Sequence, residues 1–257
     1  MLEFYKKKEF TFSIFLIVLY VLLNNLATYF DSETYLFQMI FNGSLALFML
    51  VFIFRNKLKE KYGLIKPEIK INKYVFIIFV IILSTRNLWF GIKMNMDISS
   101  TIIYLIYMLF VGICEELLFR GFLFKAIEKD GLKKAIIIVS LTFAFGHIVH
   151  IFDAGGVDMF ENIMQIIGAV FIGLVFVLIL LHTKSLVIPI IMHSVIDMLS
   201  AFANGSVITK ETHIIFVISG IILCLMFSLI LMKNTPILKE KNDTRSWFLW
   251  RKLKEVQ

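Results

Sequence analysis

The sequence predicts an all-α polytopic membrane protein with about eight transmembrane helices, and three features of its composition predict this fold class. Hydrophobic residues make up 59% of the 257 residues, and charged residues only 18%. The mean hydropathy is +0.86. In soluble globular domains, about half of the residues are apolar and about a quarter are charged. So high an apolar content excludes a disordered chain. The net charge of +7 is distributed between apolar blocks, which argues against a soluble nucleic-acid-binding protein.

Each predicted helix rests on an apolar stretch of roughly 20 residues, the length that crosses the hydrocarbon core of a bilayer. Runs such as VFIIFVIIL (75–83) do not alternate in polarity, which excludes the strands of an outer-membrane barrel. Because lipid offers no partner to unpaired backbone groups, each stretch should be helical. The predicted spans are residues 10–30, 34–54, 74–93, 99–124, 135–152, 160–181, 185–204 and 213–232.

The basic residues predict how the chain is oriented. Lys6 to Lys8 precede the first span, whose long apolar run has no small-x-small cleavage site, so we expect it to remain as a signal anchor. If the N-terminus is cytoplasmic, the cytoplasmic segments hold 22 of the 26 Lys and Arg residues, and the opposite side holds Lys93 and Lys210. The positive-inside rule therefore predicts a multi-pass cell-membrane protein with both termini in the cytoplasm.

We expect three parts along the chain. Residues 1–98 hold the first transmembrane helices and a basic loop, 99–204 form the core with the candidate site, and 205–257 add the last helix and a basic cytoplasmic tail. The tail is either solvated or associated with the anionic inner leaflet. Cys114 and Cys224 lie in different spans and predict no disulfide framework.

Ionisable side chains inside three spans are the candidate functional residues. A charge in the middle of a bilayer costs at least about 2.5 kcal/mol on insertion scales, so such residues need a reason to be there. They occur in GICEELLFRGF (112–122), TFAFGHIVH (142–150) and SLVIPIIMHSVID (185–197). The candidates are Glu115, Glu116, Arg120, His147, His193 and Asp197. His150 lies nearer to a span end and is expected at the membrane interface.

The helical rise indicates that these residues share one layer of the membrane. At 1.5 Å per residue, Glu115, His147 and His193 lie about 12–18 Å from the cytoplasmic edge. Glu116 and Arg120 are spaced i,i+4 and can pair, as can His193 and Asp197.

Small residues and a proline suggest how the spans pack. We expect Gly121 and Gly146 to allow close helix approach. Pro189, one turn before His193, is expected to kink its span and free a carbonyl group.

Hydrolysis by an activated water suits this set of side chains. A carboxylate and an imidazole can act together as a general base, and a second imidazole can hold a developing oxyanion. A divalent metal such as Zn is an alternative, with Glu115, His147 and His193 as its ligands. Each residue also has a structural interpretation: an ion pair between Glu116 and Arg120, a packing role for Glu115, and hydrogen bonds between helices for the histidines.

At these positions the chain resembles a family of intramembrane endopeptidases, the CAAX-protease and bacteriocin-processing family, also called CPBP or Abi. Its motif EExxxR matches Glu115, Glu116 and Arg120, FxxxH matches Phe143 and His147, and HxxxN or HxxxD matches His193 and Asp197. The three motifs occur in order on separate predicted helices. The resemblance covers about residues 99–204.

The resemblance implies a role for each matched residue. Glu115 would activate water with help from His147, while His193 and Asp197 would line the oxyanion site. Arg120 would orient the glutamates, and Phe143 would shape the pocket. An ionised Asp cannot donate a hydrogen bond as Asn can, so we expect Asp197 to orient His193.

These observations lead to one functional hypothesis and two rivals. The hypothesis is an intramembrane endopeptidase, glutamic-type or metal-dependent, that cleaves membrane-associated proteins or peptides by a Glu/His-activated water. The resemblance extends it to bacteriocin processing or self-immunity, and the Lys- and Ile-rich sequence suggests a bacterium. The rivals are a proton- or metal-coupled transporter, since buried ionisable residues also form proton relays, and a non-catalytic bacteriocin-immunity protein.

Overall fold

The computed structural model describes residues 2–31, 34–147, 159–207, 209–235 and 238. Within these residues the chain is helical, and its only β-pairing is an isolated bridge between Ile92 and Ala203. The α-helices are α1 (Leu2–Lys7), α2 (Glu9–Phe30), α3 (Leu36–Arg55), α4 (Lys73–Ser84), α5 (Ile98–Glu115), α6 (Phe124–Ile127), α7 (Leu132–Gly146), α8 (Met159–Thr183), α9 (Val187–Ser200) and α10 (Lys210–Asn234). The other helical turns are η1 (Arg86–Leu88), the π-helix η2 (Glu116–Leu123), η3 (Glu128–Asp130) and η5 (Gly205–Val207).

The all-α polytopic fold is confirmed, because each predicted span contains a helix. Five continuous helices in the described part of the chain are long and apolar enough to cross a membrane: Glu9–Phe30, Leu36–Arg55, Ile98–Asp130, Met159–Thr183 and Lys210–Asn234. Two others, α4 and α9, are shorter than predicted, and α7 is described from Leu132 to Gly146. The end of the predicted span 135–152, with His150, lies outside the described residues, as do residues 239–257 of the predicted tail.

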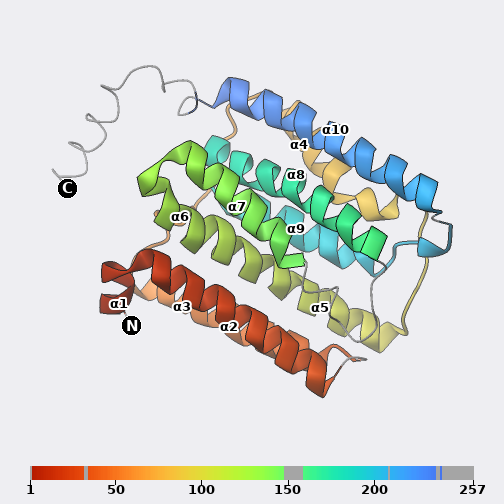
Figure 1. Cartoon of the computed structure of the whole chain (residues 1–257), viewed down its shortest axis with the longest axis horizontal. Coiled ribbons are helices and arrows are strands. Elements are labelled where there is room, and N and C mark those ends of the chain that lie inside the picture. The colour runs from red at the N-terminus through yellow and green to blue at the C-terminus, as the bar shows by residue number, and fades with distance from the viewer. Residues whose placement is uncertain (1, 32–33, 148–158, 208, 236–237, 239–257) are drawn as a thin grey trace.

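The helices form a bundle with one pair of helices on each of two opposite sides and four helices between them (Figure 1). Helices α2 and α3 lie along one edge, and α10 and α4 lie along the opposite edge. Helices α5, α7, α8 and α9 fill the space between the edges. The three helices that carry the sequence motifs are therefore interior helices.

Polar side chains cap the starts of α4 and α5. The side chains of Asn72 and Asp97 accept backbone N–H bonds at the starts of α4 and α5. Hydrogen bonds from Ser100 and Ser99 hold the pKa of the exposed Asp97 carboxyl below its usual range.

The predicted kink at Pro189 is wrong. Because Pro189 is the third residue of α9, its missing N–H removes no intrahelical bond.

Arg86 and Asn87 account for the early end of α4. The guanidinium of Arg86 lies 4.5 Å from the ring centroid of Phe216 on α10, in space that a Cβ on Gly220 would occupy. Asn87 donates a side-chain hydrogen bond to the carbonyl of Ile196 on α9. These contacts turn the chain across the ends of α9 and α10, so the predicted span 74–93 is helical only as far as Ser84, with one further turn at Arg86–Leu88.

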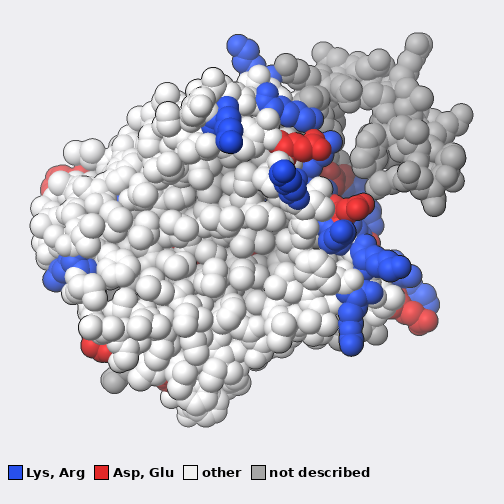
Figure 2. Space-filling view, turned by 180° about the vertical axis from the view of Figure 1, so that it is seen from behind, with Lys and Arg blue, Asp and Glu red and all other residues white. Residues whose placement is uncertain are grey.

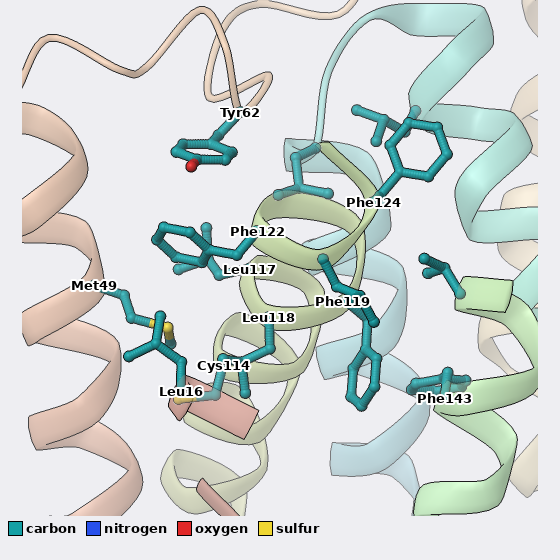
Figure 3. Close-up of a cluster of buried hydrophobic side chains, with 14 of the residues drawn as sticks. Leu16, Met49, Tyr62, Cys114, Leu117, Leu118, Phe119, Phe122, Phe124 and Phe143 are labelled. Atoms are coloured by element: carbon teal, nitrogen blue, oxygen red, sulfur yellow. The ribbon is translucent and has the colours of Figure 1, made fainter. Parts of the chain in front are cut away.

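The apolar core surrounds the π-helical segment (Figure 3). All eight residues of η2 are buried. Its apolar side chains extend toward α2, α3 and α7, where Leu16, Met49 and Phe143 are also buried. A helix that is apolar on every side is buried in the interior. Because Glu116 and Arg120 belong to η2, this packing holds both side chains inside the bundle.

The closest helix contact at the site lies at Gly112, and not at the glycines that the sequence suggested. A Cβ on Gly112 would lie 2.3 Å from Ser194 Oγ and 2.7 Å from its backbone nitrogen. At Gly121 the nearest atom would be at an ordinary 3.7 Å, and no described atom lies within 4 Å at Gly146. The expectation for Gly121 and Gly146 was therefore wrong, because close approach depends on the facing helix.

Replacing Gly112 with Ala is expected to destabilise the protein by about 1–3 kcal/mol, because α9 must move away from α5. The matched control is Gly146→Ala, which adds a methyl group in open space and favours the helix. Thermal unfolding in detergent measures both. Equal midpoints for the two variants would contradict the close packing of α5 on α9.

Basic side chains gather at one end of the molecule (Figure 2). At this end Glu9, at the start of α2, forms ion pairs with Lys61 and Lys129. Tyr5 accepts hydrogen bonds from Lys61 and from the Tyr62 hydroxyl. The contacts join α1 and α2 to the loop after α3 and to η3. The cytoplasmic location of this end stays a prediction.

Candidate active site

A buried ion pair occupies the centre of the candidate site. Oε1 of Glu116 lies 2.9 Å from Nη1 of Arg120 and 2.8 Å from Nδ1 of His193. The side chains of Glu116 and Arg120 are fully buried. The pairing of Glu116 with Arg120 expected from their spacing is therefore present, although the segment is π-helical. The wide turns of π-helices are rare in proteins overall, but those that occur are often found at functional sites.

His193 lies among three carboxyl groups. Its Nδ1 faces Glu116, while its Nε2 lies 3.3 Å from Oδ2 of Asp197 and 3.8 Å from Oε2 of Glu115. The ring thus has one hydrogen bond, between Nδ1 and Oε1 of Glu116, and its Nε2 lies near two further carboxyl oxygens. Helices α5 and α9 therefore bring two of the three sequence motifs into direct contact.

The two adjacent glutamates have different surroundings. The side chain of Glu116 is completely buried, whereas that of Glu115 is 15% exposed. Oε1 of Glu115 accepts a 2.6 Å hydrogen bond from the hydroxyl of Tyr20 on α2, and its Oε2 faces His193. Glu115 is thus the accessible carboxylate, and Glu116 is the one that holds Arg120 and His193.

Aromatic rings and one glycine enclose the arginine. The guanidinium carbon of Arg120 lies 4.0 Å from the ring centroid of Phe143 and 5.3 Å from that of Phe176. Nη2 of Arg120 donates to the carbonyl of Gly173 on α8 at 3.2 Å. A Cβ on Gly173 would lie 3.1 Å from both Arg120 and Phe143. Cation–π contacts and a missing side chain therefore fit the guanidinium between α7 and α8.

His147 lies beside this cluster. The rings of His147 and His193 each contact the ring of Phe143, with centroids 5.5 Å apart in both cases. The carbonyl of His147 accepts from Asn162, and its Nδ1 lies 3.4 Å from Nε2 of Gln165. The structure thus assembles Glu115, Glu116, Arg120, Phe143, His193 and Asp197, and it places His147 next to them through Phe143 and α8.

Sequence reasoning missed Tyr20, Gly173 and Phe176. Phe176 contacts the ring of His193 at a centroid distance of 5.4 Å. The signal for Tyr20 was a hydroxyl inside the apolar segment LIVLYVLLNN (16–25). For Gly173 and Phe176, an apolar helix offers no comparable signal.

The arrangement does not fit the hypothetical zinc ligands. Among the described residues, no three His, Cys, Asp or Glu side chains are placed to hold one metal ion. Glu115, His147 and His193 therefore form no ligand set in this geometry.

One family model matches the part of the chain that holds these side chains. Residues 97–199 match Type II CAAX prenyl endopeptidase Rce1-like. The match confirms the resemblance found from the three motifs. It includes the seven residues predicted for the site, but Tyr20 lies outside it. No curated protein and no solved structure matches the chain.

Proposed function

With the family match over residues 97–199 as the premise, we propose that this chain is an intramembrane endopeptidase that hydrolyses a peptide bond of a membrane-associated protein or peptide. The observation that carries the proposal is the orientation of Glu115. Its carboxylate is accessible, one of its oxygens is held by Tyr20, and the other faces Nε2 of His193. A carboxylate oxygen and an imidazole nitrogen thus lie 3.8 Å apart inside the bundle.

The proposed reaction begins with a water molecule bound between these two groups. Oε2 of Glu115 and Nε2 of His193 are 3.8 Å apart, so one water can hydrogen-bond to both. Glu115 accepts a proton from this water, and the oxygen forms a bond to the scissile carbonyl carbon. The same proton then passes to the leaving nitrogen as the C–N bond breaks, which yields a carboxyl group and an amine.

The remaining residues keep His193 in place in this proposal. Glu116 holds the Nδ1 side of the His193 ring, and Arg120 neutralises the charge of Glu116. Asp197 orients the Nε2 side of the same ring. As the tetrahedral intermediate forms, the single N–H at Nε2 donates to its oxyanion in place of Asp197 and the water. His147 is assigned the role that the resemblance implies, assistance to Glu115, and Phe143 shapes the pocket between the two imidazoles.

We further propose that the protein lies in a bacterial cell membrane with both termini in the cytoplasm, and that residues 99–204 form its catalytic core. Its substrate is a membrane-associated protein or peptide, and bacteriocin processing or self-immunity is its pathway. The clustering of Lys and Arg at one end of the bundle supports the orientation.

A comparison of peptide termini tests the proposal. Membranes from cells that express the intact chain are compared with membranes that hold the Glu115→Gln variant at matched abundance. We expect new termini only with the intact chain, and their sequences would identify the substrate class. Identical termini in the two membranes would overturn the protease. Loss of coupled flux in the Glu115→Gln variant would then favour a transporter, and unchanged toxin protection would favour an immunity protein.

Replacing Asp197 separates its orienting role from its charge. Asp197→Asn keeps an oxygen that can accept from Nε2 of His193, so we expect kcat/KM to fall by less than about 10-fold, whereas Asp197→Ala should cost about 10–100-fold. Steady-state cleavage of a peptide found in the comparison above measures both. Equal losses in the two variants would show that the negative charge is required.

A further inference from the structure

The hydrogen bond between Tyr20 and Glu115 joins two parts of the chain that are 95 residues apart. Tyr20 lies on α2, outside the segment that matches the family model. Its hydroxyl donates to Oε1 of Glu115 at 2.6 Å, a length typical of an O–H group bound to an ionised carboxylate. The donor to the proposed general base therefore comes from the N-terminal helix.

A polar network holds α2 in register with the site. The side chain of Asn24 donates to the carbonyl of Tyr20 at 2.9 Å, and it accepts a 2.9 Å bond from Asn42 on α3. Asn42 is almost fully buried, and its carbonyl accepts from the thiol of Cys114, which directly precedes Glu115. In lipid, side-chain hydrogen bonds between helices specify how the helices align.

The bond fixes the direction of the carboxylate. Oε1 of Glu115 is occupied by the tyrosine hydroxyl, so Oε2 is the oxygen that faces His193. Without this donor the carboxylate can rotate about its terminal torsion, which is broad in glutamate. A base must lie within hydrogen-bonding distance of the proton that it takes, so loss of this orientation slows the chemical step more than it weakens binding.

We propose that Tyr20 is a positioning residue that directs Glu115 toward the attacking water, and that the catalytic site therefore includes α2. This inference rests on the endopeptidase function proposed above. It adds a contribution from residues 1–98 to a site otherwise built from α5, η2, α7, α8 and α9.

Tyr20→Phe tests the inference, because it removes only the hydroxyl. We expect kcat to fall about 10- to 100-fold, the loss that corresponds to one hydrogen bond to a charged group, with KM unchanged. Tyr29→Phe is the matched control, since it makes the same change on α2 at a side chain that is 84% exposed. Activities are expressed per monodisperse, folded protein, and the thermal midpoint is measured alongside.

A second measurement follows the carboxylate without relying on activity. The infrared band of Glu115 is assigned from the difference between the intact chain and Glu115→Gln. We expect Tyr20→Phe to shift this band and Tyr29→Phe to leave it in place.

The outcomes separate the inference from the function on which it rests. An unchanged kcat or an unshifted band in Tyr20→Phe, with Glu115→Gln inactive, overturns the role of Tyr20 alone. A change confined to KM or to the folded fraction also overturns it. If the intact chain shows no cleavage that depends on Glu115, the proposed function fails, and a band shift then supports only the hydrogen bond.

Discussion

Replacing Glu115 with Gln is expected to lower kcat by at least about 100-fold, which is the scale of a general base. The Gln carbonyl oxygen can still accept the hydrogen bond from Tyr20, and the side chain keeps its size, so the fold should be retained. The amide of Gln is too weak a base to accept a proton from water, so the proposed chemical step is lost. Cleavage of a peptide substrate by purified protein in detergent, together with the thermal midpoint, measures the two effects separately.

The neighbouring glutamate supplies the comparison for this prediction. Glu116→Gln makes the same chemical change one residue away, but at a carboxylate that is fully buried against Arg120. It should lower the thermal midpoint clearly, because the Arg120 cation loses its partner. If Glu115→Gln unfolds the protein while Glu116→Gln abolishes only activity, the assignment of the two carboxylates is reversed.

Replacing Arg120 with Met is expected to destabilise the protein by about 3–5 kcal/mol, because it leaves Glu116 as an uncompensated buried charge. The double variant Glu116→Gln with Arg120→Met removes both charges and should recover much of the loss. Thermal or denaturant unfolding in detergent, with the yield of monodisperse protein, provides the measurement.

Arg86→Met is the matched control for this second prediction. Arg86 also lies within the bundle, but none of the ion pairs found among the described residues includes it. Its loss leaves no buried carboxylate behind and should cost clearly less. Equal losses at Arg86 and Arg120, with no recovery in the double variant, would contradict the central role of the Glu116–Arg120 pair.

Much of the site could be predicted because charges in lipid are rare and costly. Glu115, Glu116 and His193 stand out in apolar spans, and the rise per residue places them at similar depth. Asp197 follows from the i,i+4 spacing that brings it to His193. Such reasoning needs only one helix at a time and a common membrane frame.

Contacts that depend on the facing helix could not be predicted. Tyr20 carries no charge, and nothing in its own span indicates that its partner is Glu115. Gly112 is in close contact because Ser194 faces it, whereas no described atom lies within 4 Å of a Cβ built on Gly146. The spacing of Glu116 and Arg120 is compatible with both α- and π-helical turns, so it gave no sign of η2.

The boundary between α5 and η2 falls between the two glutamates: Glu115 ends the α-helix and Glu116 begins the wider turn. A π-turn holds more residues than an α-turn, so this segment has a surplus relative to a regular α-helix. Removing one residue after Arg120 would return it to α-helical turns, and the i,i+4 spacing that pairs Glu116 with Arg120 would be kept. Related chains are therefore expected to differ in length by one residue here more readily than they change the spacing between Glu116 and Arg120.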